Sequence, residues 1–199
     1  MRSRLLIAAL LFIPAAVAAQ ERPGLFDCEG CESIHEHSFD DLSWSTVVAP
    51  PGEPGDKLVI DGRVYKTDGK TPAEGVIVYI HHTNAKGLYP QNGSLEGWGR
   101  RHGYLRAWAK SNAKGDYRFE TIRPAPYPNG GIPAHVHYII KEPNRKEYWI
   151  DDIVFTDDPL IDESYRRRAS NPRGGQGIAT PTRDASGVWH VRRDIILER

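Results

Sequence analysis

The chain has 199 residues, with 26 lysine and arginine residues against 26 aspartate and glutamate residues. The chain has no excess of basic residues, so its net charge gives no electrostatic case for DNA or RNA as a partner. A single domain with a sizeable core is the expectation for this length.

The N-terminus has the layout of a secretory signal peptide. Arg2 and Arg4 precede a short apolar run that ends in small residues, and cleavage after Ala18 or Ala19 is expected. The run is too short to span a bilayer comfortably, and no later segment is apolar enough for a membrane anchor. We therefore expect residues 1–19 to be removed and the mature protein to be periplasmic or secreted, with 24 basic and 26 acidic residues.

Residues 20–56 are acidic and rich in turn-forming residues, and they end in the proline-rich run VVAPPGEPGD. This composition predicts an irregular N-terminal arm or linker. The only two cysteines, Cys28 and Cys31, lie in this arm. In an oxidising compartment they could form a local disulfide. A redox-active or metal-binding pair is the alternative, although the second C-x-x-C of a zinc ribbon is missing.

From residue 57 to residue 199 the pattern is one of short strands separated by turns. Alternating polarity, β-branched and aromatic residues, and Gly, Asp or Asn punctuation all favour strands. The predicted strands lie within 57–70, 75–83, 103–111, 115–123, 134–142, 149–155 and 187–193. A short helical turn is expected within 158–171. Strands at such close spacing without long helices predict an all-β domain, an antiparallel sandwich or barrel.

The segment IPAHVHY places His135 and His137 two residues apart in a predicted strand. Side chains at this spacing leave the same face roughly 7 Å apart, so both imidazoles could reach one metal ion. Tyr127 lies just upstream in the Pro/Gly-rich loop RPAPYPNGG, and Tyr89 lies in the similar loop NAKGLYPQNG. Loops carried by a rigid sheet are where binding side chains concentrate. The two tyrosines and two histidines therefore form a candidate ligand set.

These motifs resemble those of the intradiol ring-cleavage dioxygenases, the family of the protocatechuate, catechol and hydroxyquinol dioxygenases. The similar stretches are DGRVYKTDGKTPAEGVIVYIHHTNAKGLY, KGDYRFETIRPAPYPNGGIPAHVHY and FTDDPLI, between about residues 58 and 161. The order of two tyrosines and H-x-H, with the P-Y-P and P-A-H-x-H contexts, is the specific part. The resemblance implies an antiparallel β-sandwich of the intradiol dioxygenase type.

The resemblance also implies one non-haem Fe(III) per chain, held by Tyr89, Tyr127, His135 and His137. Phenolates are hard anionic ligands that stabilise iron(III), and neutral imidazoles complete such a site. In the family a catechol displaces one tyrosinate, which would be Tyr127 here, and the freed phenolate can take up a substrate proton. The implied reaction consumes O₂ and opens a catechol-type diol between its hydroxyl-bearing carbons to give a muconate-type dicarboxylate.

The chain departs from the family pattern at two positions. Relatives that act on catechols usually carry an arginine just before P-A-H-x-H, where Ile132 stands here, and Asp152 stands where some relatives carry a glutamine. A lost active-site charge can cost several kcal/mol of transition-state stabilisation. Three arginines near the ligand loops in sequence are candidates to replace this charge: Arg100, Arg101 and Arg123.

Two other functions remain open from the sequence. A secreted β-sandwich binding module without catalytic activity would bind its ligand without consuming oxygen, and Ile132 in place of arginine keeps this reading open. A zinc hydrolase could use His135 and His137 with Asp151 or Asp152. The sequence leaves the choice of catechol and the number of subunits open, a homo-oligomer included.

Overall fold

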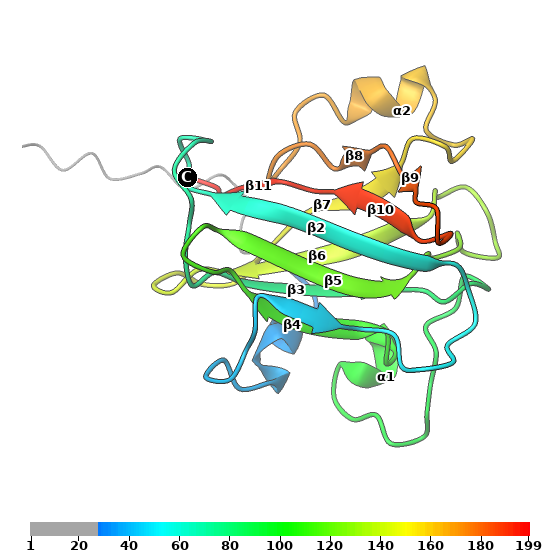
Figure 1. Ribbon diagram of the computed structural model, residues 1–199, viewed down its shortest axis with the longest axis horizontal. Coiled ribbons are helices and arrows are strands. Elements are labelled where there is room, and N and C mark those ends of the chain that lie inside the picture. The colour runs from blue at the N-terminus through cyan, green and yellow to red at the C-terminus, as the bar shows by residue number, and fades with distance from the viewer. Residues whose placement is uncertain (1–27) are drawn as a thin grey trace, which may run out of the picture.

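The computed structural model describes residues 28–199, so the predicted signal peptide lies outside the described residues. Two β-sheets pack face to face (Figure 1), which confirms the predicted all-β sandwich. The first sheet has the order β1 (Ser45–Val47), β5 (Asp116–Ile122), β2 (Lys57–Tyr65), β10 (Trp189–Arg192) and β9 (Thr182–Arg183), with β11 (Ile195–Ile196) also paired to β2. The second has the order β4 (Arg106–Lys110), β3 (Ile77–His82), β6 (His135–Lys141), β7 (Tyr148–Phe155) and β8 (Ile178–Ala179).

The central strand pairs are antiparallel, as predicted, but both sheets also contain parallel pairs. β1 pairs with β5, β10 and β11 pair with β2, and β7 pairs with β8 in parallel. One partner in each of these pairs has four residues or fewer. Among these short parallel strands the sequence marks only β10, which lies within the strand predicted at 187–193. Whether a strand runs parallel to its partner depends on the connection between them, which an alternating pattern does not encode.

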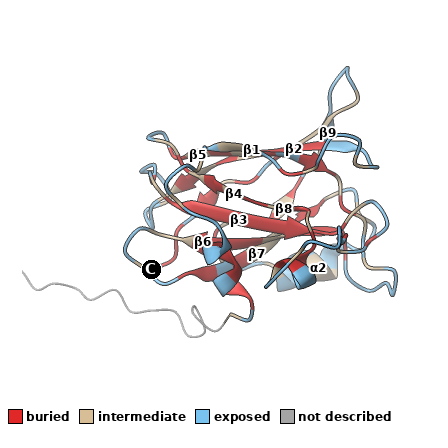
Figure 2. Cartoon of the chain, turned by 90° about the horizontal axis from the view of Figure 1, so that it is seen from below, coloured by how far each residue is buried: buried red, intermediate tan, exposed pale blue. Residues whose placement is uncertain are grey.

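Alternation places every second side chain of the longer strands in the core between the sheets. Leu58, Ile60 and Val64 of β2 face Val136, Tyr138 and other buried residues of the second sheet. β3 is buried at every position (Figure 2), because the outer face of its sheet is covered as well. A strand that is covered on both faces does not show the alternation of apolar and polar residues that is typical of a strand with one exposed face.

The N-terminal segment covers part of that outer face. A 3₁₀-helix, η1 (Cys31–Glu36), packs Cys31 and Ile34 against Ile77, Tyr79 and Ile139. The indole Nε1 of Trp108 donates a hydrogen bond to the Ile34 carbonyl at 2.8 Å. Within its described residues the predicted irregular arm therefore carries a helix and, further on, the strand β1.

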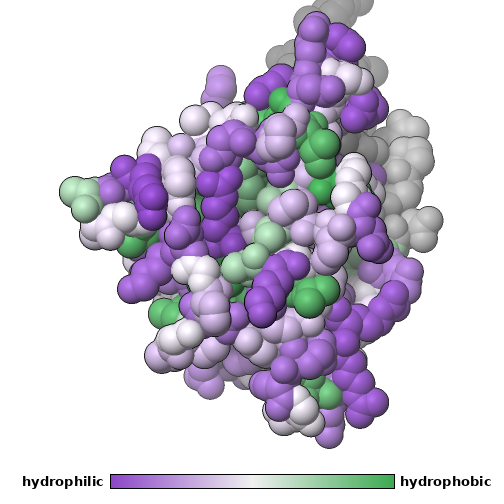
Figure 3. Space-filling view, turned by 90° about the vertical axis from the view of Figure 1, so that its right-hand side faces the viewer, coloured by the Kyte–Doolittle hydropathy of each residue, from purple (hydrophilic) through white to green (hydrophobic). Residues whose placement is uncertain are grey.

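Two short α-helices complete the structure, α1 (Gly99–His102) and α2 (Glu163–Arg168). The second lies inside the segment predicted to hold a helical turn, and the Asp162 side chain caps it by accepting from the Tyr165 N–H at 2.7 Å. None of the helices in the described part of the chain has the length and apolar character that crossing a bilayer would need. On the face shown in Figure 3 hydrophilic residues prevail, with hydrophobic ones in small patches.

Candidate metal centre

β6 carries His135 and His137 on the outer face of its sheet. The intervening Val136 and the following Tyr138 are buried in the core, so the alternation expected from the sequence is present. The Nε2 atoms of the two histidines lie 3.1 Å apart. The pairing of β6 with β7 is irregular between Val136 and Tyr138, which places the local distortion of the strand at His137.

The two tyrosines reach these histidines from two different loops. Tyr89 follows β3 and Tyr127 precedes β6, and their hydroxyl oxygens lie 2.6 Å apart. The Tyr89 hydroxyl is 2.9 Å from Nε2 of His137, and the Tyr127 hydroxyl is 3.2 Å from Nε2 of His135. The four predicted ligand atoms therefore meet at one point.

Gly87 explains how the two loops come so close. Its φ is +74°, and a Cβ at this position would overlap the carbonyl oxygen of Pro126. Only glycine fits such a backbone conformation and such a close approach. At Gly87 the backbone of the Tyr89 loop therefore packs directly against the backbone of the Tyr127 loop.

Both histidines are held with Nε2 free to bind a metal. Nδ1 of His135 lies 2.7 Å from the Pro133 carbonyl, and Nδ1 of His137 lies 3.1 Å from the Asp152 carboxylate. Because a carbonyl and a carboxylate can only accept hydrogen bonds, each Nδ1 carries the proton and each Nε2 presents a lone pair. Such partners are the usual way in which proteins orient metal-binding histidines.

The protonation of these side chains is also compatible with metal binding. Burial, followed by the neighbouring His137, lowers the pKa of His135, so its imidazole is neutral at pH 7. Burial and the hydrogen bond with Tyr127 raise the pKa of Tyr89. A cation at the meeting point of the four atoms would reverse that shift by stabilising the phenolate.

The donor set fits a ferric ion. Two phenol oxygens and two neutral imidazole nitrogens supply hard, anionic donors with nitrogen donors. His135, His137 and Asp152 also form a group with one donor atom each within 4.8 Å of one another. However, Asp152 contacts the Nδ1 side of His137, away from the meeting point, so it orients the ring.

The three arginines considered from the sequence contact other groups. Nε of Arg100 donates to the Leu95 carbonyl, Arg101 pairs with Glu29 at 2.6 Å, and Arg123 pairs with Asp157. None of their hydrogen bonds or ion pairs within residues 28–199 reaches a predicted ligand. Ile132 is 49% exposed and leaves an apolar side chain beside the site.

Two cavities border the ligand set, and both include Asp152 and Tyr165. The larger, of about 500 Å³, lies against His137, and the smaller, of about 330 Å³, lies against His135 and Ile132. Arg168 of α2 is the arginine that lines the smaller cavity. The sequence does not point to Arg168, because α2 lies about thirty residues beyond the predicted ligands.

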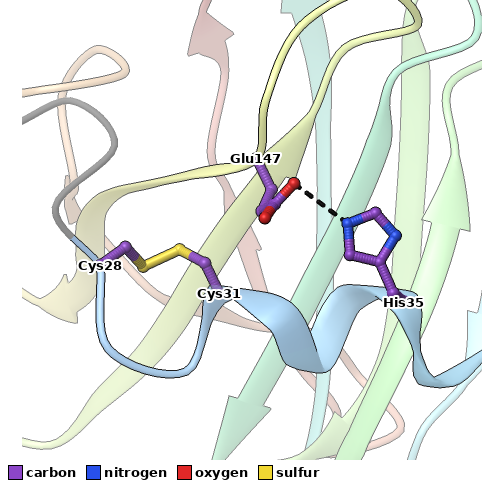
Figure 4. The surroundings of a disulfide bond; sticks show 4 residues. All are labelled: Cys28, Cys31, His35 and Glu147. Atoms are coloured by element: carbon purple, nitrogen blue, oxygen red, sulfur yellow. Dashed lines mark hydrogen bonds and ion pairs between the residues drawn. A yellow bond between two sulfur atoms is a disulfide. The ribbon is translucent and has the colours of Figure 1, made fainter.

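Cys28 and Cys31 form the disulfide expected for an oxidising compartment, with their Cα atoms 5.6 Å apart. Figure 4 shows this bond at the start of η1 and, about one turn further, His35 paired with Glu147. Nε2 of His35 lies 3.0 Å from the Glu147 carboxylate. Cys28 and the neighbouring Glu29 line the larger cavity. The disulfide loop is therefore part of the wall around the candidate metal centre.

Comparison with known proteins gives the family. A model of the Dioxygenase family matches residues 42–171, a stretch that contains all four predicted ligands. Over 128 residues the chain is 30% identical to catechol 1,2-dioxygenase 1 of Acinetobacter lwoffii, covering 56% of this chain and 40% of that protein. It is also 30% identical over 125 residues to the protocatechuate 3,4-dioxygenase beta chain of Burkholderia cepacia, covering 55% and 49%. The chain thus matches less than half of the length of these relatives.

Solved structures agree on the fold. The dioxygenase domain of a dioxygenase carbohydrate-binding protein fusion from Streptomyces sp. SirexAA-E matches with a TM-score of 0.59 at 21% identity, covering 80% of this chain and 90% of that chain. Catechol 1,2-dioxygenase from Pseudomonas arvilla C-1 matches with the same TM-score and identity, covering 78% and 56%. Together with the family model, which spans well over half of the chain, these likenesses confirm the resemblance read from the motifs. The chain belongs to the intradiol ring-cleavage dioxygenase family.

Proposed function

We propose that this protein is a non-haem iron(III) dioxygenase that opens catechol-type diols between the two hydroxyl-bearing carbons. Both atoms of O₂ would end in the two carboxylates of a muconate-type product. The observation that carries the proposal is the convergence of the hydroxyls of Tyr89 and Tyr127 with Nε2 of His135 and His137.

When bound there, Fe(III) would act as a Lewis acid that activates the ring of the diol and as a template that orients the diol. The chain's own residues would prepare the site. Asp152 and the Pro133 carbonyl keep the Nδ1 protons in place, so the two imidazoles need no reorientation. Tyr127 is the ligand we assign to proton transfer: its phenolate oxygen would take one proton from the diol.

The substrate would enter through one of the two cavities beside the ligands. Arg168 favours the smaller cavity as the substrate site, because its guanidinium could balance the negative charge of a bound diol or of the product carboxylates. Within the described residues no carboxylate pairs with Arg168; its Nη1 donates to the Ser164 hydroxyl at 2.6 Å. We therefore propose Arg168 as the charge that Ile132 does not supply, ahead of Arg100, Arg101 and Arg123.

A visible spectrum with metal analysis of the aerobically purified protein tests the assignment, before and after catechol is added under nitrogen. We expect about one iron per chain, a tyrosinate-to-iron absorption band and a shift of that band with catechol. Oxygen uptake then measures turnover. A colourless protein that cannot be loaded with ferric iron would contradict the proposal.

The same measurements separate the alternatives left open by the sequence. A zinc hydrolase would contain zinc and ignore O₂, and the contact of Asp152 with Nδ1 of His137 argues against Asp152 as its third ligand. A binding module would bind a diol without consuming oxygen.

We also propose that the protein is exported. The predicted leader motivates this, and the Cys28–Cys31 disulfide is typical of an oxidising compartment. N-terminal sequencing of the protein from periplasm or medium should find a start at Ala19 or Gln20. A chain that retains Met1 in the cytoplasm would contradict export.

A further inference from the structure

Behind His137 lies a column of stacked imidazole rings that the proposed function does not use. His81 of β3 is directly opposite His137 of β6 in the strand pairing, and their ring centroids are 4.5 Å apart with planes at 25°. His102 of α1 stacks on His81 in turn, with centroids 3.8 Å apart and planes at 1°. Within the described residues no ring contact joins His102 to His137, so His81 is the middle ring.

The two members of this column behind His137 are His81 and His102, and both are buried. His81 and His102 are each 8% exposed. The Tyr79 hydroxyl lies 2.8 Å from Nδ1 of His102, and the Trp98 ring packs against the same imidazole. Nδ1 of His81, in contrast, is buried and has no hydrogen-bond partner among the described residues. An unpaired buried nitrogen lowers the stability of the folded state. A histidine would therefore not be expected at position 81 if this residue served packing alone.

The disulfide loop closes the column at its far end. Gly30, between the two cysteines, has a φ of +89°, and a Cβ there would lie 3.3 Å from Nε2 of His102. Cys28 and Glu29 of the same loop bound the cavity that His81, His102 and His137 line from the other side. The loop thus rests on the ring that supports His81.

The segment that carries this loop is anchored to the sheet. Glu36, at the end of η1, accepts a hydrogen bond from the Trp98 N–H at 2.7 Å and pairs with Arg106. These contacts hold η1 beside α1, which carries His102. The loop, α1 and β3 therefore form one packed unit behind the candidate metal centre.

We propose that His81 is a positioning residue for the metal ligand His137, and that His102 and the Cys28–Cys31 loop hold His81 in place. Asp152 restrains the His137 ring at one atom only, which leaves the ring free to tilt about that contact. A flat ring stacked on its face removes this freedom and keeps Nε2 aimed at the metal before the metal binds. The inference rests on the proposed function, because it concerns a ligand of the proposed iron site.

The test compares His81→Leu, which keeps a similar volume without a flat ring, with His81→Phe, which keeps a flat ring without nitrogen. The affinity for ferric ion is measured by competition with a chelator, together with the position of the visible band. We expect His81→Leu to bind ferric ion at least about tenfold more weakly and with a shifted band, as is typical when a partner of a metal ligand is lost. His81→Phe should stay within about threefold of the unmodified protein, because stacking is retained.

His82→Asn is the matched control. His82 is the next residue on β3 and is also buried. Its ring contacts the Thr83 carbonyl and the Thr121 hydroxyl rather than the column. This variant should lower the thermal stability and leave the affinity for ferric ion within about twofold, since it leaves the column intact.

Wild-type affinity and band position in a folded His81→Leu variant would overturn the inference, as would a His81→Phe variant as weak as His81→Leu. If His81→Leu does not fold by circular dichroism, the Cys28→Ser/Cys31→Ser variant decides: a weaker affinity in the same direction supports the column, and an unchanged one overturns it. An unmodified protein that binds no ferric ion would instead refute the proposed function.

Discussion

Tyr89 and His137 are the side chains whose removal tests the ligand set most directly. Tyr89→Phe should weaken or abolish the visible band, because it deletes one phenolate donor. His137→Ala should lower the affinity for ferric ion by more than about 100-fold, since loss of a mere partner of a ligand already costs 10- to 100-fold. Visible spectra and metal analysis check both results, with circular dichroism as the control for folding. Full iron and full colour in His137→Ala would refute the assignment.

Arg168 is tested by its effect on substrate binding. Arg168→Ala should raise KM for catechols that carry an extra anionic group by about two- to fivefold, because an exposed charge pair is worth up to about 1 kcal/mol. Arg167→Ala is the matched control, since Arg167 lies on the same helix, pairs with Glu163 at 2.8 Å and does not line the cavity. Steady-state kinetics of both variants, alongside alanine variants of Arg100, Arg101 and Arg123, should single out Arg168.

Most residues of the candidate site could be predicted from the sequence, and the reason is local. The period of a strand brings His135 and His137 to one face, and Pro/Gly-rich loops mark Tyr89 and Tyr127. Arg168 could not be found this way, because only the fold brings α2 to the cavity. Similarly, His81 meets His137 through a strand pairing that no local pattern encodes.

At the scale of elements, β2 holds the first sheet together by pairing with β10 along its first half and with β11 near its end. Gly62 lies between these two stretches, and a Cβ there would overlap the carbonyl oxygen of Arg193. The passage of the C-terminal strands along β2 therefore requires a residue without a side chain at this position.

Gly62→Ala should thus lower the free energy of unfolding by at least about 2 kcal/mol, because overlap with backbone atoms forces the strands apart. Urea unfolding measures the change. Gly93→Ala is the control: it has a φ of +78° and open space around it, so its cost should be limited to about 1 kcal/mol of backbone strain. Equal losses in the two variants would contradict the role of the close approach.

The sequence identified the longer strands and missed the elements of the N-terminal segment. β1 could not be predicted, because it lies in a segment rich in turn-forming residues. Its three residues are held in a strand by backbone pairing with β5 rather than by a pattern of their own. The same composition gave no indication of η1, which is held in place by Ile34 in an apolar cluster with Tyr79 and Ile139. Such short elements are stabilised by their pairing with a sheet or their packing against it.

For the whole molecule, buried histidines should make stability depend on pH. Burial lowers the pKa of His82 and of His102 to about 4, and lowers that of His81 well below its usual value. In the unfolded chain a histidine has a pKa near 6.5, so below that pH the unfolded state binds more protons than the folded state. The stabilising contribution is thus complete above about pH 6.5 and decreases as the pH falls toward 4.

We expect the metal-free protein to lose free energy of unfolding over this range, with His82 alone contributing on the order of 3 kcal/mol. Urea unfolding between pH 7.5 and 4.5 measures the dependence, and His82→Asn should make it shallower. A free energy of unfolding that stays constant between pH 7 and 5 would contradict the prediction.

The two faces of β6 have different roles. Val136, Tyr138 and Ile140 pack in the core, whereas the candidate ligands His135 and His137 lie on the outer face. Inserting or deleting one residue in this strand would exchange the faces, so that imidazoles enter the core and apolar side chains replace the ligands. Length changes in β6 would therefore remove the fold and the candidate ligand set in a single event. The loop that carries Tyr127 has more freedom, because its length can vary as long as the phenol still reaches the strand. Natural length variation in relatives should accordingly accumulate in such loops and be absent from β6.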